Sequence, residues 1–178
     1  MCIRDSATLA GVNPRIVVGQ LIGLDDQGAY AGAPAFDLML QAMSGLMSIT
    51  GEAGGKPVRV GYQVADLAGG LYLALGVAAG LVQAQASGTG ERVQVSLFDA
   101  QMAMLTWQAQ GYLQGGAVPR ASGARHAMIA PSDIYRTSDG RWIALAPTGD
   151  AFWQALCAAI GRPGLAADAR YALSLIHI

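Results

Sequence analysis

Apolar and polar positions along the first two thirds of the chain predict successive strand–helix units. Residues 14–23 form a short β-branched run that ends in glycine, and residues 15–21 within it are predicted to be a buried strand. After a turn-rich loop at residues 24–34, residues 36–51 carry apolar side chains at intervals of three and four, as on one helix face. We expect the inner face of that helix to hold Phe36, Met39, Leu40, Met43, Leu46 and Met47.

The longest apolar run follows a single carboxylate, Asp66. Residues 67–82 carry no charge but include four glycines, and they are fewer than the roughly 20 apolar residues of a membrane span. We therefore expect a buried helix after Asp66 and no membrane partner. Its predicted inner face comprises Leu71, Leu75, Ala78, Ala79 and Val82.

A second strand and helix are expected after a turn at residues 87–91. Residues 92–98 alternate, which indicates a strand. Residues 99–116 read as one helix, with Asp99 stabilising its start and Gly115 marking its end.

The last third of the chain changes character. Residues 117–133 form a long loop, residues 134–147 predict a hairpin with Ser-Asp-Gly at its turn, and residues 150–161 predict an amphipathic helix. Two strand–helix units followed by a small α+β module indicate the α/β class. The change in pattern predicts a domain boundary near Val118.

The two ends of the chain are related at the level of DNA. One reverse translation of the start, ATG TGT ATA AGA GAC AG, has the reverse complement CTG TCT CTT ATA CAC AT, which encodes Leu-Ser-Leu-Ile-His as at residues 173–177. That DNA looks like a transposon end used in sequencing libraries, and such segments are set aside before the fold is interpreted. We therefore assign residues 1–6 and 173–178 to adapter DNA and expect both natural ends to be missing.

Composition excludes several classes of function. The net charge is −1 and basic residues do not cluster, which argues against nucleic acid as a partner. Without its ends the chain keeps one cysteine, Cys157, and one histidine, His126, so we expect neither a disulfide nor a metal site. We expect a cytoplasmic protein, because a lone cysteine suits a reducing compartment.

Asp66 is the strongest candidate for chemistry. Local sequence favours an N-cap, because an aspartate before an apolar helix is a common helix start. A carboxylate there also faces the positive end of the helix dipole and is able to act as a nucleophile. Gly69 and Gly70 are expected to let a substrate approach the backbone.

Five ordered blocks resemble the family III CoA-transferases, and together they span residues 13–172. They read NPRIVVGQLIG, AFDLMLQAMSGLMSITGE, PVRVGYQVADLAGGLYLALGVAAGL, SGTGERVQVSLFDAQ, and SDGRWIALAP with the residues that follow it. The resemblance implies a partial Rossmann-like large domain at residues 7–117 and the start of a small α+β domain at residues 118–172. It also implies an interlocked homodimer for the complete protein.

The same resemblance implies a reaction. Asp66, in the block VADLAGG, takes the place of the family's nucleophile, which attacks an acyl-CoA thioester. An aspartyl–acyl anhydride and an aspartyl–CoA thioester follow, and CoA passes to a carboxylic acid. Coenzyme A thus enters as a substrate, and no metal is expected. Backbone N–H groups of the glycine-rich helix start are expected to stabilise the oxyanion.

Two further segments are assigned by position in the family. Ala33, Pro34, Ala35 and Phe36 match a stretch that lies along CoA, although Pro34 stands where some members have lysine. The loop at residues 122–126, with Gly123 and His126, matches a mobile loop over the active site, but it keeps only one glycine.

Two alternatives stay open. One is a 2-methylacyl-CoA racemase of the same fold. Racemases place a histidine where this chain has Phe36, which favours the transferase. The other is that the 178-residue chain is an inert fragment whose strands pair only with missing ones, leaving edges that aggregate.

Overall fold

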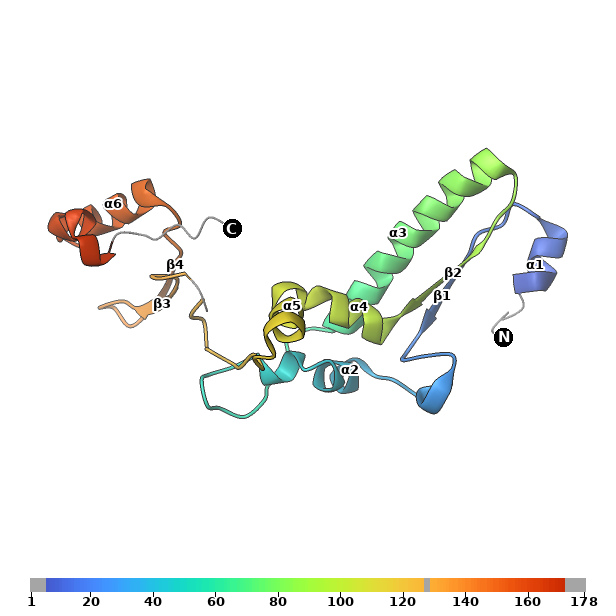
Figure 1. Ribbon diagram of the computed structural model, residues 1–178, viewed down its shortest axis with the longest axis horizontal. Coiled ribbons are helices and arrows are strands. Elements are labelled where there is room, and N and C mark those ends of the chain that lie inside the picture. The colour runs from blue at the N-terminus through green and yellow to red at the C-terminus, as the bar shows by residue number, and fades with distance from the viewer. Residues whose placement is uncertain (1–5, 127–128, 172–178) are drawn as a thin grey trace. The chain divides into compact units, whose positions relative to one another are not determined.

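The computed structural model describes residues 6–126 and 129–171, and the chain divides into two compact units between Ala121 and Ser122 (Figure 1). The predicted adapter segments lie outside the described residues except for Ser6, which begins α1 (Ser6–Val12). The assignment of residues 7–117 and 118–172 to two domains of a complete protein stays a prediction.

The first unit is built on a parallel pair of strands. β1 (Val18–Ile22) pairs with β2 (Arg92–Ser96), with Val18 opposite Arg92 and Ile22 opposite Ser96. The long helix α3 (Val64–Ser87) packs on both strands (Figure 1). Parallel strands require such a crossover connection, so the predicted α/β class is confirmed. The strands pair with each other and not only with missing ones, contrary to the premise of the fragment hypothesis.

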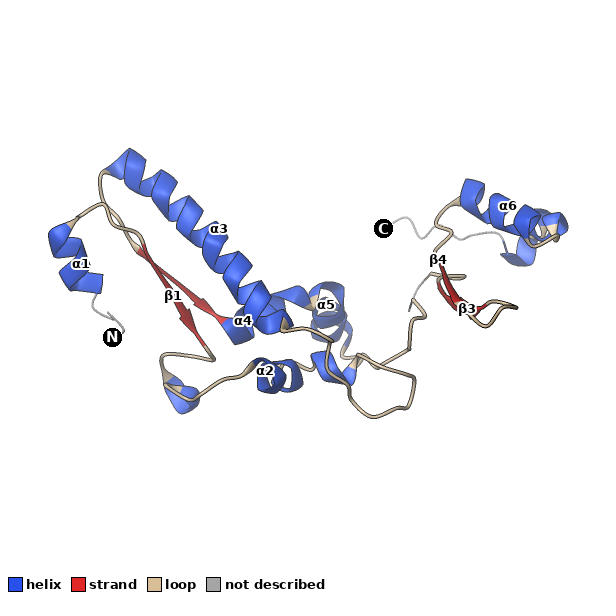
Figure 2. Ribbon diagram, turned by 180° about the vertical axis from the view of Figure 1, so that it is seen from behind, coloured by secondary structure: helices blue, strands red, loops and turns tan. Residues whose placement is uncertain are grey.

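Helices gather at the carboxyl ends of the two strands. Figure 2 shows α2 (Asp37–Met43) and the first turns of α3 and α4 (Leu97–Met104) on the side toward which the strands point. Both α2 and α4 contact α3. In open α/β sheets this edge is where ligands bind.

The expected helix over residues 36–51 is shorter than predicted. α2 ends at Met43, Gly45 adopts a left-handed φ of 82°, and a short 3-10 turn, η2 (Leu46–Ser48), follows. A left-handed glycine ends a helix because it redirects the chain away from the helical path. The predicted inner face is also wrong. Of its six residues only Leu40 is buried, whereas Phe36, Met39 and Met43 are 68%, 46% and 43% exposed.

α3 buries a different face from the one predicted. Its buried residues are all Ala or Gly, whereas the predicted inner residues Leu71, Leu75 and Val82 are 69%, 68% and 68% exposed. Close approach to the sheet explains the choice. A Cβ added to Gly76 would lie 2.6 Å from Val93 Cγ1 on β2, so glycine is needed at this position. The helix is therefore only partly buried, whereas a buried helix was expected.

By length and composition α3 also passes the test for a membrane span. Among the described residues α3 is the one helix long and apolar enough to cross a membrane. Its mean hydropathy is 1.7, and 22% of the apolar stretch is buried. A helix that packs on a sheet passes the same test, so this finding carries little weight.

The helix expected at residues 99–116 is two helices. α4 begins at Leu97, and Ser96 is its N-cap, with its Oγ accepting from the Asp99 N–H at 3.2 Å. α5 (Thr106–Gly115) follows a break at Thr106, whose φ is 44°. Gly116, rather than Gly115, supplies the left-handed C-cap. Asp99 lies in the first turn of α4, where its negative charge interacts favourably with the positive end of the helix dipole.

The second unit is a hairpin followed by helices. β3 (Asp133–Arg136) pairs antiparallel with β4 (Trp142–Leu145), which confirms the predicted hairpin. α6 (Asp150–Ala159) packs on η3 (Pro163–Ala167), and η4 (Ala169–Tyr171) follows. Cys157 on α6 is fully buried and has a free thiol, as a small core residue would.

The hairpin turn offers a testable pH effect. Hydrogen bonds from Arg141 first, and then from the Thr137 hydroxyl, lower the pKa of Asp139 from 3.8 to about 2. The guanidinium Nε donates to Asp139 Oδ2 at 2.7 Å. The pKa of Asp139 is lower in the folded than in the unfolded state. Its hydrogen bonds therefore stabilise the folded state above the unfolded pKa near 4, and this contribution is lost as the pH falls toward 2.

We expect an NMR titration of the Asp139 carboxyl in the full-length protein to have its midpoint at about pH 2. Arg141→Met should raise that midpoint toward 3.8, because the largest cause of the shift is removed. An unchanged midpoint in this variant would contradict the assignment.

Candidate functional site

Asp66 is the third residue of α3. The helix begins at Val64 with Gln63 as the N-cap residue, so the predicted N-cap role of Asp66 is wrong. Its side chain is exposed, and within residues 6–126 and 129–171 neither its carboxylate nor its N–H has a hydrogen-bond partner. The N-cap thus lies three residues earlier than predicted, and another carboxylate binds an N–H group at the helix start.

That carboxylate is Asp37, the first residue of α2. Its Oδ1 accepts from the backbone N–H of Ala65 at 2.8 Å, which satisfies one of the donors left open at the start of α3. Its Oδ2 accepts from Gln41 Nε2 at 2.6 Å. Gln63 makes no side-chain cap bond, so the cap comes from a residue 28 positions away in the sequence.

Gln41 extends this contact to the segment that leads into α3. The side chain is fully buried, its Oε1 accepts from the Val60 N–H at 2.8 Å, and its Nε2 reaches the Tyr62 carbonyl at 3.4 Å. Sequence analysis missed both Asp37 and Gln41. The available signal was a pair of polar residues four apart on α2, a spacing that places both on one side of a helix.

The two glycines after Asp66 differ in their surroundings. Gly69 is buried, and a Cβ there would lie 2.3 Å from Leu97 Cδ2, so this glycine serves the packing of α3. Gly70 is exposed, with no atom within 4 Å of an added Cβ. The expected room for a substrate therefore exists at Gly70 and not at Gly69.

The predicted CoA segment lies beside this helix start. Ala33, Pro34, Ala35 and Phe36 lead directly into Asp37, and Phe36 is the N-cap residue of α2. Ala35 packs against Gly23, where a Cβ would lie 2.4 Å from the Ala35 Cβ. Gly23 follows β1, so the segment crosses the carboxyl end of that strand. The structure thus brings the segment and Asp66 to one edge of the sheet.

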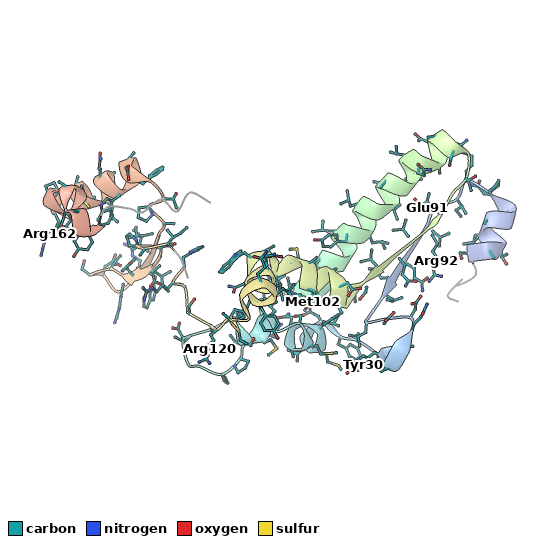
Figure 3. The ribbon with its side chains drawn as sticks, viewed as in Figure 1. Tyr30, Glu91, Arg92, Met102, Arg120 and Arg162 are labelled. Carbon is teal, nitrogen blue, oxygen red and sulfur yellow. The ribbon has the colours of Figure 1, made fainter. Side chains whose placement is uncertain are left out.

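Polar contacts fasten the loop after β1 to β2. Arg92, labelled in Figure 3, lies 3.8 Å from Asp26, whose Oδ2 also accepts from Gln94 Nε2 at 3.0 Å. Ser96 Oγ donates to the Leu24 carbonyl at 2.7 Å. These bonds hold the start of the chain that leads to residues 33–36.

Gly123 and His126 belong to the second unit. Gly123 has a φ of 67°, and the loop is closed by local bonds. The His126 N–H donates to the Ser132 carbonyl at 2.9 Å, and its Nδ1 accepts from the Ile129 N–H at 3.1 Å. The imidazole therefore helps to shape its own loop.

The described part of the chain contains a hollow of about 370 Å³ that is separate from Asp66. None of the predicted site residues lines it, and its walls are mainly apolar. They come from η2, α4, α5 and the chain after them, with Met102 marked in Figure 3. Across the described residues there is also no group of three or more His, Cys, Asp or Glu side chains placed to hold a metal ion.

The parallel strand pair and its crossover helix place the chain in the α/β class. Asp66, exposed in the first turn of that helix at the carboxyl edge of the strands, is the candidate nucleophile. The family model described as CoA-transferase family III matches residues 4–175. The chain belongs to this family, and the resemblance seen in its five blocks is confirmed.

Named relatives and a solved structure agree with that assignment. The chain is 36% identical to succinate–glutarate CoA-transferase of Agrobacterium fabrum, over 98% of the chain and 43% of the relative. It is also 36% identical to acetyl-CoA:oxalate CoA-transferase of Acetobacter aceti, over 92% of the chain and 42% of the relative. A crystal structure of a CAIB/BAIF family protein from Brucella suis superposes with a TM-score of 0.79 at 32% identity, covering 95% of the chain and 44% of that protein. The chain therefore spans about two fifths of the length of these proteins.

Proposed function

We propose that the complete protein transfers coenzyme A from an acyl-CoA to a carboxylic acid, with Asp66 as the nucleophile. The observation that carries the proposal is the exposed carboxylate of Asp66, which has no partner among the described residues, at the sheet edge that the residue 33–36 segment also crosses. The names of the two relatives, a succinate–glutarate CoA-transferase and an acetyl-CoA:oxalate CoA-transferase, support this substrate class.

The proposed chemistry has four balanced steps. The Asp66 carboxylate attacks the thioester carbonyl, the C–S bond breaks, and CoA leaves as a thiolate with an aspartyl–acyl anhydride behind it. The thiolate attacks the aspartyl carbonyl, releasing the donor acid and forming an aspartyl–CoA thioester. The acceptor carboxylate displaces CoA from this thioester to form a second anhydride. CoA thiolate then attacks the acceptor's acyl carbonyl, which restores the Asp66 carboxylate.

The backbone N–H group that is available to an oxyanion differs from the one expected from the sequence. Only N–H groups in the first turn of a helix lack helical partners, and Gly69 and Gly70 lie beyond that turn. The Ala65 N–H already binds Asp37, whereas no bond to the Asp66 N–H occurs in the described ranges. The Asp66 N–H is therefore the better candidate to stabilise an oxyanion there.

Covalent labelling tests the proposal. The full-length protein is incubated with an acyl-CoA, digested, and examined by mass spectrometry for a CoA or acyl adduct on the peptide that contains Asp66. We expect the adduct in the wild type and its absence in Asp66→Ala. No adduct in the wild type, together with an active Asp66→Ala variant, would sink the proposal.

The same sample distinguishes transfer from racemisation. A racemase would wash deuterium from solvent into the α-carbon of a 2-methylacyl-CoA without any acceptor acid. We expect no such exchange, since Phe36 at the start of α2 offers no ionisable group for a second base.

We propose further that the complete protein acts in the cytoplasm as an interlocked homodimer, and that the 178-residue chain is inactive by itself. Large apolar side chains are exposed on α3 at Leu71, Leu75 and Val82. Their exposure supports the proposal that other parts of the complete protein or its partner chain cover this face. Light scattering of the full-length protein should give the mass of a dimer, and the isolated chain should form no adduct.

A further inference from the structure

We propose that Asp37 is a positioning residue for the Asp66 nucleophile, and that it acts through a cap on the first turn of α3. This inference rests on the proposed function of Asp66 and adds two residues, Asp37 and Gln41, that support it. Neither has a role in the reaction steps described above.

The contact begins one residue before the nucleophile. Asp37 Oδ1 binds the Ala65 N–H at 2.8 Å, and Ala65 is fully buried. The main chain of Ala65 is therefore held on one side by packing and on the other by a charged acceptor. Because Asp66 is the next residue, the direction in which its carboxylate leaves the helix depends on this bond.

Gln41 fixes the position of the cap itself. Its Nε2 donates to Asp37 Oδ2 at 2.6 Å, so both carboxylate oxygens of Asp37 are engaged. Gln41 also binds the Val60 N–H at 2.8 Å. The buried amide thus ties α2 to the chain on the N-terminal side of α3, and the helix start is held at two points.

Among the described residues, no side chain near the start of α3 takes the place of this cap. Gln63, the N-cap residue of α3, makes no side-chain bond to the helix start, and the side chains of Val64 and Ala65 cannot accept one. Removing Asp37 would leave the first turn free to fray or rotate. A displacement of about 1 Å at a reacting group lowers the rate about 100-fold.

Asp37 also joins the nucleophile to the proposed CoA segment. Phe36 precedes Asp37 directly, so residues 33–36 and Asp66 are connected through one peptide bond and the hydrogen bond to Ala65. A thioester lying along residues 33–36 would therefore be held in a fixed position relative to the carboxylate that attacks it.

The test measures adduct formation on Asp66 in the full-length protein, as a single-turnover rate at increasing acyl-CoA concentration. We expect Asp37→Ala to lower the maximal rate about 100-fold, with the half-saturating acyl-CoA concentration changed less than about threefold. Asp37→Asn keeps an acceptor oxygen for the Ala65 N–H and should recover at least about a tenth of the wild-type rate. Asp150→Ala, the matched control at the first position of α6, should be unchanged.

The outcomes separate this inference from the proposed function. A folded Asp37→Ala variant with the wild-type rate overturns the positioning role, while the adduct on Asp66 still supports the transferase. No wild-type adduct, together with an active Asp66→Ala variant, overturns the transferase proposal and this inference with it.

A second variant decides the matter if Asp37→Ala does not fold. Gln41→Met keeps the buried volume and removes the amide that holds Asp37. A slower maximal rate at an unchanged half-saturating concentration supports the inference, and a wild-type rate overturns it. If Asp37→Asn has wild-type thermal stability but is as slow as Asp37→Ala, the charge and not the cap is required, which also overturns it.

Discussion

Replacing Asp66 with asparagine is expected to lower CoA transfer by about 10⁴-fold or more, because the loss of the proposed nucleophile removes the proposed covalent path and leaves only binding. The carboxamide keeps the shape of the side chain but is a poor nucleophile and forms no anhydride. Steady-state transfer from an acyl-CoA to a dicarboxylic acid, measured in the full-length protein, gives the rate. The free energy of unfolding should change by less than about 1 kcal/mol, since the residue is exposed and only its favourable interaction with the helix dipole is lost.

Asp99→Asn is the matched control for this prediction. Asp99 is also the third residue of its helix, α4, and is also exposed. Its replacement removes the same charge from the same helical position, so any general effect of the dipole appears in both variants. Equal activity of the two variants would show that Asp66 has no special role in the chemistry.

The second large effect is expected on stability, at Gly90. A Cβ added there would lie 1.8 Å from the Ile16 carbonyl oxygen and 2.5 Å from its carbon, both of which belong to the backbone. The Gly90 N–H also donates to the Pro14 carbonyl at 2.7 Å, immediately before β1 and β2 pair. Gly90→Ala must therefore separate the two segments, and we expect it to lower the free energy of unfolding by about 3 kcal/mol or more.

Gly111→Ala provides the comparison for Gly90→Ala. Gly111 lies within α5, and no atom is within 4 Å of an added Cβ. Alanine favours a helix interior over glycine by about 0.5–1 kcal/mol, so this variant should be slightly more stable than the wild type. Urea unfolding of the full-length protein measures both, and similar midpoints for the two variants would contradict the close contact at Gly90.

Several elements could be predicted because their signals are local. The hairpin is predicted from the Ser-Asp-Gly turn, β1 from a β-branched run ended by glycine, and β2 from the alternation of residues 92–98. The breaks at Gly45 and Thr106 could not be predicted, since the apolar spacing continues through both positions while the backbone changes direction. Periodicity reports which side chains share a face, but it does not report where a helix stops.

The buried face of α3 shows a second limit. Leucines on one side of a helix usually indicate the inner face, yet here alanine and glycine face the strands. The reason is distance. A Cβ on Gly76 would lie 2.6 Å from Val93, so at this point of the helix no side chain fits against β2, whereas Leu73 and Val77 reach β1 beside Gly19.

Five ordered blocks of sequence are enough to assign the family, and Asp66 is visible in the sequence as the lone carboxylate beside a long apolar run. The folded chain is needed to see that Asp66 is not the N-cap residue of its helix, that Asp37 supplies the capping hydrogen bond, and that Gln41 binds Asp37. The Asp37–Gln41 bond is local to α2, but the bonds that tie this pair to the start of α3 join residues 19 and 28 positions apart. Such contacts leave no periodic trace in the sequence, because each is a single hydrogen bond formed when α2 packs beside the start of α3.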